Sequence, residues 1–312
     1  MIDWIAIYMR MMELIYRRAD EFDVLHFHTD YFPLSLFSRQ RTPFLTTLHG
    51  RLDIPEFKDV YELFDAPFVS ISDSQRRPIP RLNWIRTVHH GMPANLLTPQ
   101  SVEQDYLAFL GRISPEKGVD RAIKIARTLG IPFKIAAKVD RVDETYFREH
   151  IAPLLKAPGV EFIGEINEQE KTEFLGQALA LMFLIDWPEP FGLSMIEAMA
   201  CGTPVLAFKR GAVEEVLENG ITGYLVDTLE EAIAAVPRVV GLDRRTVRRQ
   251  FESRFTSTRM AKDYAKVYKL LLDQMSLTAK IELIPVSRVP TQVEPVPTAP
   301  AQYAIEPNEP AI

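Results

Sequence analysis

The stretch Leu179 to Phe208, LALMFLIDWPEPFGLSMIEAMACGTPVLAF, decides the fold of this chain. It predicts an apolar strand, a loop stiffened by prolines, a short helix and a second apolar strand. Pro190 keeps the helix from starting earlier, and Gly202 followed by Pro204 is a typical helix end. Ligands of open parallel sheets bind outside the carboxyl ends of the strands, so the loop is a candidate binding site.

The same alternation of apolar runs with helical patterns extends along most of the chain and predicts an α/β fold with parallel sheets. The expected strands are 24–28, 44–48, 68–71, 87–89, 106–110, 133–137, 160–163, 179–185, 205–208 and 224–226. The expected helices are 4–18, 119–129, 143–156, 168–177, 192–200, 212–218 and 257–273.

Composition limits the class of protein. The 312 residues are 47% hydrophobic and 25% charged, which is enough apolar material for about two domains. The net charge of −6 disfavours binding of long nucleic acid. The single cysteine, Cys201, excludes an intramolecular disulfide and fits a reducing compartment. The longest apolar run, 178–185, is too short for a membrane span, and the N-terminus lacks a signal-peptide pattern, so we predict a cytoplasmic protein.

Changes of pattern along the chain predict its domains. The polar stretch 92–104 has no clear periodicity and is the expected domain boundary. Seven of the 23 prolines fall within 285–312, which predicts a disordered tail. The expected parts are an N-terminal domain at 1–98, a second domain at 99–256, a helix at 257–275 and the tail at 280–312.

Two carboxylates accompany the central loop and helix, Glu189 on the loop and Glu197 in the helix. An ionised carboxylate only accepts hydrogen bonds and can bind two hydroxyls at once, which suits a sugar or a ribose. Either residue alone would more often be a solvated surface charge. Free backbone N–H groups near Gly192, Leu193 and Ser194 favour a phosphate at the helix start.

Two other strands are followed by residues that suit the same site. After the strand at 106–110 come Arg112, whose planar fork matches phosphate oxygens, and Lys117, which adds a point charge. His49 directly follows the strand at 44–48, so it also lies at a carboxyl edge. Alone, such a histidine is more often a structural hydrogen-bonding residue.

Three motifs together resemble family 4 glycosyltransferases, which are retaining enzymes of the GT-B fold. They are EPFGLSMIEAMACGTPV at 189–205, AFKRGAVEEVLENGITGYLVD at 207–227 and YLAFLGRISPEKGVD at 106–120. The resemblance implies two Rossmann-like parallel-sheet domains that face a cleft. It implies sugar transfer from a nucleotide-diphosphate donor with retention of configuration, without a metal or cofactor. The acceptor (a saccharide, a lipid or a small molecule) and a peripheral position at the membrane are left open.

The resemblance also gives roles to residues at the matching positions. Glu189 would lie beside the donor sugar, and Glu197 would bind the ribose of the nucleotide. Arg112 and Lys117 would grip the diphosphate, and His49 would face the donor sugar from the first domain. The catalytic set is Glu189, His49, Arg112 and Lys117, and the donor-binding set is Arg112, Lys117, Phe191, Gly192, Leu193, Ser194 and Glu197.

The N-terminal part departs from the family pattern. Such enzymes usually begin with a strand and a glycine-rich loop, whereas the first 90 residues contain one glycine, Gly50. We therefore expect an incomplete first domain, shorter by about 70 to 80 residues. Its sheet would have an uncovered edge or an exposed apolar face. The alternative function is an inactive remnant that at most binds the donor; a sugar-nucleotide epimerase of the same fold is disfavoured by the paired glutamates.

Three weaker patterns have simpler explanations. His26 and His28 alternate on a strand and share a face, but no third metal ligand is evident, so packing and hydrogen bonding are favoured. Asp140 and Asp143 are expected to open the following helix rather than to bind a metal. A basic cluster is expected to be a solvated helix face, with contact to an acidic acceptor or lipid as the alternative; it consists of Arg244, Arg245, Arg248 and Arg249.

Overall fold

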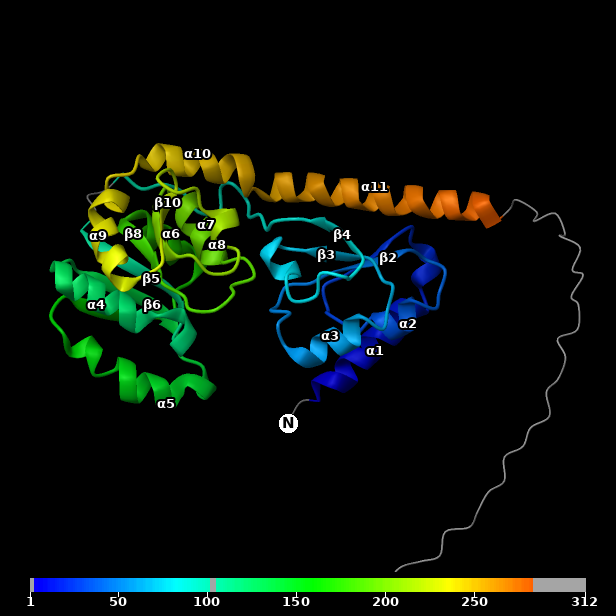
Figure 1. Cartoon of the computed structure of the whole chain (residues 1–312), viewed down its shortest axis with the longest axis horizontal. Coiled ribbons are helices and arrows are strands. Elements are labelled where there is room, and N and C mark those ends of the chain that lie inside the picture. The colour runs from blue at the N-terminus through cyan, green and yellow to red at the C-terminus, as the bar shows by residue number, and fades with distance from the viewer. Residues whose placement is uncertain (1–2, 102–104, 283–312) are drawn as a thin grey trace, which may run out of the picture. The chain divides into compact units, whose positions relative to one another are not determined.

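The computed structural model describes residues 3–101 and 105–282, with side chains as far as Gln274. The compact unit Met1–Asp273 contains two parallel sheets, as the α/β prediction requires (Figure 1). The strand orders are β1-β2-β3-β4 and β10-β9-β8-β5-β6-β7. The first sheet consists of β1 Leu25–Phe27, β2 Phe44–Thr47, β3 Phe68–Ser70 and β4 Trp84–Thr87. The second consists of β5 Tyr106–Arg112, β6 Phe133–Lys138, β7 Val160–Gly164, β8 Ala178–Phe183, β9 Val205–Phe208 and β10 Gly223–Val226.

Successive residues of the first sheet face two different cores, as the pleat of a strand requires. Phe44 and Phe68 pack into a core with α1 (Trp4–Tyr16), α2 (Leu34–Phe37) and α3 (Pro55–Tyr61). Their neighbours Leu45 and Val69 pack instead against Val267 of α11 (Ser257–Glu282). The last helix therefore contacts the first sheet, far from it in the sequence.

The second sheet has the same alternation. Leu107 and Phe109 face a core that includes α4 (Val119–Leu129) and α9 (Leu229–Val240). Tyr106 and Ala108 face the core on the other side, formed with α6 (Glu168–Gly176), α7 (Leu193–Ala200), α8 (Val213–Val216) and α10 (Arg244–Arg254). The strand order reverses direction between β5 and β8, so this switch point is where a ligand is expected.

Most of the predicted elements are confirmed, but the strand expected at 87–89 is wrong. It lies earlier, at Trp84–Thr87, where it pairs with β3 at the edge of the first sheet. An edge strand buries less of its surface, and none of these side chains is fully buried. The apolar run that marks a central strand is therefore missing at this position.

The helix expected at 143–156 is confirmed only in part, because the segment is not one regular α-helix. The chain forms α5 (Glu144–Tyr146), a π-helical turn at Phe147–Ile151 and a 3₁₀ turn at Leu154–Lys156. Pro153 has no N–H to donate, so a regular helix cannot continue through it. Of the predicted tail, 280–282 belong to α11, and 283–312 lie outside the described residues.

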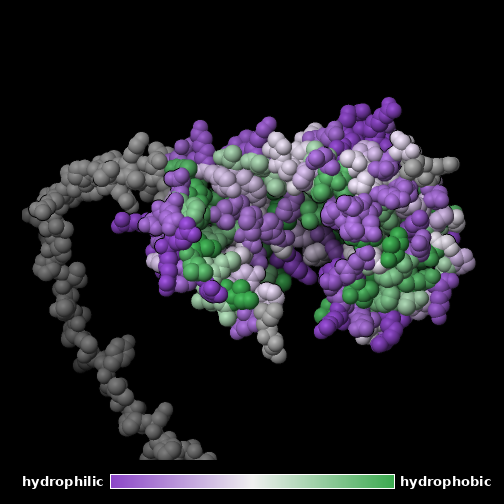
Figure 2. Space-filling model, turned by 180° about the vertical axis from the view of Figure 1, so that it is seen from behind, coloured by the Kyte–Doolittle hydropathy of each residue, from purple (hydrophilic) through white to green (hydrophobic). Residues whose placement is uncertain are grey.

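Of the expected uncovered edge or exposed apolar face of the first sheet, the described residues show an edge, at β1. Both faces of this sheet pack into apolar cores, so its face is not exposed. The nearby α1 instead leaves Trp4, Ile5 and Met9 exposed by 63%, 66% and 62%. Figure 2 shows apolar side chains reaching the surface in several patches between polar ones. Within the described ranges 3–101 and 105–282, no helix is both long enough and apolar enough to cross a membrane.

Candidate functional site

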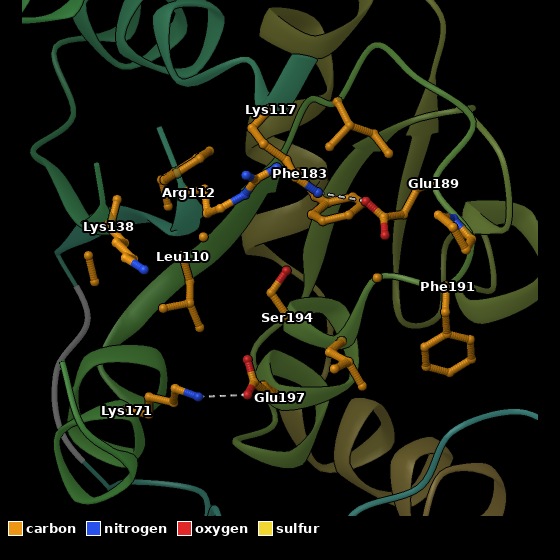
Figure 3. Close-up of a pocket in the computed structure, with 18 of the residues that line it drawn as sticks. Leu110, Arg112, Lys117, Lys138, Lys171, Phe183, Glu189, Phe191, Ser194 and Glu197 are labelled. Atoms are coloured by element: carbon orange, nitrogen blue, oxygen red, sulfur yellow. Dashed lines mark hydrogen bonds and ion pairs between the residues drawn. The ribbon is translucent and has the colours of Figure 1, made fainter. Parts of the chain in front are cut away.

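A cavity of about 620 Å³ opens at the carboxyl ends of β5, β6 and β8, beside the switch point of the second sheet (Figure 3). The structure brings every predicted site residue to its wall, including His49 from the first sheet. Their chemical roles remain predictions. The predicted residues on the wall are His49, Arg112, Lys117, Glu189, Phe191, Gly192, Leu193, Ser194 and Glu197.

Gly192 lets α7 begin at the cavity. Its φ is +89°, and a Cβ atom there would lie 2.5 Å from Cε of Met195 and 3.0 Å from the ring of Phe183. No side chain caps the start of this helix. Among the described residues, the backbone N–H groups of Leu193 and Ser194 have no hydrogen-bond partner. These donors and the positive end of the helix dipole favour an anionic or hydroxyl-bearing ligand.

Glu189 forms an ion pair with Lys117. Its Oε2 accepts a hydrogen bond from Nζ of Lys117 at 2.7 Å, and the side chains are only 12% and 19% exposed. The carbonyl of Glu189 accepts a second bond from the N–H of Ala212, which holds the loop against the strand-to-helix turn. An ammonium has three donors, so Lys117 keeps further donors that can bind a ligand in the cavity.

Glu197 is paired in the same way, with a lysine that the sequence analysis missed. Nζ of Lys171 donates a hydrogen bond to Glu197 at 2.9 Å (Figure 3). It donates a second one to Glu168 at 2.7 Å. Burial opposes the charge of Lys171, but the hydrogen bonds to both glutamates outweigh it and raise its pKa. Lys171 lies on α6, after a different strand, so the spacing of the glutamate motif could not identify it.

Arg112 ends β5 with its guanidinium beside Asp140, at 3.2 Å, and beside Glu116, at 3.5 Å. Asp140 also binds Lys138 at 2.9 Å. Asp140 and Asp143 lie at helix starts, as predicted: Asp140 precedes the 3₁₀ turn Arg141–Asp143, and Asp143 precedes α5, although neither side chain makes a capping hydrogen bond. Asp140 also orients two cations at the rim of the cavity.

His49 belongs to a cluster of imidazoles. Its Nε2 lies 2.7 Å from Nδ1 of His28, and its ring stacks on His90 with 5.3 Å between centroids. His26 lies on the same face of its strand as His28, as predicted, with 4.2 Å between ring centroids. Burial, together with the neighbouring imidazoles, lowers the pKa of His26 to about 3 and that of His49 and His90 to about 4. Among the described residues no group of three histidine, cysteine or acidic side chains could hold a metal ion.

We expect this cluster to make the protein sensitive to acid. In the unfolded chain these histidines titrate near pH 6.5, so between about pH 6.5 and 4 the unfolded state binds more protons than the folded state. The free energy of unfolding should therefore fall as the pH falls through this range. Urea unfolding at several pH values measures this free energy. The variant His49→Gln should reduce its dependence on pH. A stability that is constant from pH 7 to pH 5 would contradict the prediction.

Glu215 connects α8 to the first half of the chain. It accepts hydrogen bonds from the backbone N–H groups of Asp73 and Ser74, both at 2.7 Å, and lies 3.4 Å from His89. Burial alone would raise the pKa of Glu215, but the hydrogen bonds from His89 and the two N–H groups lower it. Glu215 lies within the motif at 207–227, but no local pattern gives it a role, because its partners Asp73 and Ser74 are 142 and 141 residues away in the chain.

Replacing Glu215 with glutamine should destabilise the fold by about 1–3 kcal/mol, because a glutamine would turn its NH₂ group toward one of the two backbone N–H donors, those of Asp73 and Ser74. Glu214→Gln is the matched control, since Glu214 is the exposed neighbour on the same helix and should change stability by less than about 0.5 kcal/mol. Urea unfolding measures both. Equal changes in the two variants would disprove the bridging role of Glu215.

The prediction of a solvated basic helix face is wrong for two of its four arginines. Arg244 donates to the carbonyls of Gly176 and Ala178, and Arg248 donates to the carbonyls of Leu97 and Ala200. Both guanidinium groups thus hold α10 against the second sheet and its linker. They satisfy backbone acceptors that would otherwise be left unpaired.

Comparison with known proteins identifies the class. Residues 98–249 match the family model described as "Glycosyl transferases group 1". This part of the chain belongs to that glycosyltransferase family. The two parallel-sheet domains have the GT-B fold of its structural relatives, as the motifs implied.

Individual relatives agree with this assignment. The chain is 28% identical over 190 residues to a probable sucrose-phosphate synthase of Thermosipho melanesiensis, covering 56% of this chain and 44% of that protein. It is 26% identical over 265 residues to N-acetyl-alpha-D-glucosaminyl L-malate synthase of Bacillus anthracis, covering 72% of this chain and 65% of that one. It thus spans roughly half to two thirds of these relatives. The HepE protein of Anabaena, solved with UDP and glucose, is similar in fold, with a TM-score of 0.70, 17% identity, and coverage of 83% of this chain and 81% of that chain.

Proposed function

We propose that this chain transfers a sugar from a nucleotide-diphosphate donor to an acceptor hydroxyl, with retention of the anomeric configuration. The observation that carries the proposal is the composition of the cavity wall. Arg112 and the ion pairs Lys117–Glu189 and Lys171–Glu197 surround one space at the switch point of the second sheet. Cations suit a diphosphate, and carboxylates suit the hydroxyls of a ribose and a sugar.

The donor would bind along the wall in a fixed order. The diphosphate lies against Arg112 and the two free donors of Lys117, and the ribose hydroxyls donate to Glu197. The sugar hydroxyls lie near Glu189 and the free N–H groups at the start of α7. His49 faces the sugar from the first sheet. This order follows the family resemblance and is supported by the position of each residue on the wall.

The reaction would break the bond between the anomeric carbon and the diphosphate oxygen and form a bond to the acceptor oxygen. Arg112 and Lys117 stabilise the negative charge that develops on the leaving diphosphate, a task that a metal ion performs in other transferases. The proton of the acceptor hydroxyl passes to the departing diphosphate. The acceptor is a saccharide, a lipid or a small molecule with a free hydroxyl.

A binding experiment tests the donor assignment. Calorimetry with UDP-glucose, ADP-glucose and GDP-mannose in the presence of EDTA identifies the preferred nucleotide sugar. Glu197→Ala should weaken binding of that donor by at least tenfold, because the ribose loses its acceptor. Glu197→Gln, which keeps the volume, checks that the loss is not caused by misfolding. Glu173→Ala, at an exposed position on α6, is the matched control.

A turnover experiment separates a transferase from a protein that only binds the donor. We expect release of the nucleoside diphosphate when acceptors are added, with a product of the same anomeric configuration as the donor. Binding without release in any acceptor mixture would support the inactive remnant. Normal donor binding by Glu197→Ala would overturn the site assignment itself.

A further inference from the structure

His28 is the nearest polar neighbour of the cavity residue His49, yet the proposed reaction gives it no role. It lies just after β1, whereas His49 lies just after β2, and the parallel pairing of these strands brings the two imidazoles together. Nδ1 of His28 lies 2.7 Å from Nε2 of His49, a normal hydrogen-bond distance. His90 stacks on His49 with an angle of only 7° between the rings. The orientation of His49 is therefore fixed by two contacts.

This hydrogen bond restricts which nitrogen His49 can offer to a ligand. Nε2 is already occupied by His28, and among the described residues Nδ1 has no hydrogen-bond partner. A neutral imidazole carries one proton, so one nitrogen donates while the other accepts. The burial that disfavours the charged form keeps His49 neutral near pH 7.

The two neutral rings can share this bond in only two ways. If His28 donates from Nδ1, both rings must carry their proton on Nδ1, the less stable tautomer of a free neutral imidazole side chain. If His49 donates from Nε2, both rings carry their proton on Nε2, the more stable tautomer. The second arrangement satisfies both rings at once and leaves Nε2–H of His28 to solvent, since this side chain is exposed.

We propose that His28 is a positioning residue that holds His49 in the Nε2–H tautomer, so that Nδ1 of His49 is a hydrogen-bond acceptor for a hydroxyl group of the donor sugar. The sugar part of this inference rests on the proposed function. An accepting nitrogen selects a hydroxyl or another donor group and rejects a phosphate or carboxylate oxygen, which has no proton to give. His49 would thus contribute to recognition of the sugar rather than of the diphosphate.

Nuclear magnetic resonance tests the tautomer without any ligand. In the ¹⁵N-histidine-labelled chain at pH 7.5, long-range ¹H–¹⁵N spectra should show His49 with a protonated Nε2 and a bare Nδ1. His28→Leu should move both nitrogen shifts of His49 toward the average of the two tautomers. His28→Asn should preserve them, because its amide oxygen can accept at the position of Nδ1. His150→Asn, at an exposed position outside the cluster, is the control.

Two results would overturn the inference at this stage. One is a wild-type His49 protonated on Nδ1. The other is a His49 spectrum unchanged in a folded His28→Leu variant, which would mean that His28 does not set the tautomer. Both results are independent of whether the protein transfers sugar.

A binding comparison then tests the sugar part. His28→Leu should weaken binding of the preferred nucleotide sugar by about three- to tenfold, leave binding of the nucleoside diphosphate alone unchanged, and be rescued by His28→Asn. If His28→Leu weakens binding of the nucleotide sugar and of the nucleoside diphosphate equally, the role of His28 is merely structural. If it weakens binding of neither, His49 has no role in sugar recognition. Each result overturns this part of the inference. A wild-type protein that binds neither molecule contradicts the proposed function, and the spectra still decide the tautomer.

Discussion

Replacing Arg112 with alanine should lower the rate of sugar transfer by about 10²- to 10³-fold, the usual cost of removing one group that stabilises charge in a transition state. The guanidinium lies at the end of β5, where Asp140 and Glu116 hold it on the cavity wall. Because the negative charge of the diphosphate grows as the bond to the sugar breaks, the loss should appear mainly in kcat. Steady-state kinetics with the preferred donor measure it.

Two further variants make this result specific. Arg141→Ala removes an exposed arginine on a neighbouring turn and should leave kcat unchanged. Asp140→Asn weakens the hold on Arg112 without removing it, so its effect should be smaller than that of Arg112→Ala. If Arg112→Ala raises KM but keeps kcat, the arginine binds the donor without stabilising the leaving group, and this part of the mechanism is wrong.

Gly211→Ala should be strongly damaging although Gly211 lies outside the cavity wall, with a loss of about 3 kcal/mol or more in the free energy of unfolding. Gly211 has a φ of +60°, and a Cβ atom there would overlap the backbone N and O atoms of Glu189 and lie 2.7 Å from the carbonyl carbon of Pro188. The loop that carries Glu189 would have to move. Donor affinity should therefore fall together with stability, which urea unfolding and calorimetry measure on the same sample.

Gly220→Ala is a control that separates the effect of atomic overlap at Gly211 from the effect of a positive φ angle alone. Gly220 also has a positive φ, +77°, but nothing lies within 4 Å of the position of its Cβ. We expect Gly220→Ala to lower the free energy of unfolding by only about 1–2 kcal/mol and to leave donor binding normal. A similar loss in both variants would show that the close approach of Gly211 to the Glu189 loop is unimportant.

Local patterns of the sequence predicted the second half of the fold well. The helix at 119–129 and the strand at 205–208 have the predicted bounds, because a clear apolar period is bracketed by glycine or proline. The loop and helix at 189–200 were also predicted correctly. Because they follow a parallel strand, the sequence also indicated where the cavity lies. The helix at Leu229–Val240 was not predicted, because Pro237 lies inside it. The spacing of Thr228 and Glu231, a capping signal, could have indicated its start.

The partners of the site residues could not be predicted in the same way. Lys171 pairs with Glu197, 26 residues away, and His26 bonds Tyr268, 242 residues away. Such pairs depend on strand order and on the packing of α11, which no local period encodes. The same holds for Arg244 and Arg248, whose charge pattern predicts a solvated face until their backbone acceptors are known.

A crystal structure with the preferred nucleotide sugar would show whether the cavity beside β5 and β8 is the donor site. We expect the diphosphate within hydrogen-bond distance of Arg112 and Lys117, the ribose hydroxyls on Glu197 and a sugar hydroxyl on Nδ1 of His49. A nucleotide bound elsewhere, or bound in the cavity with its ribose away from Glu197, would contradict this expectation.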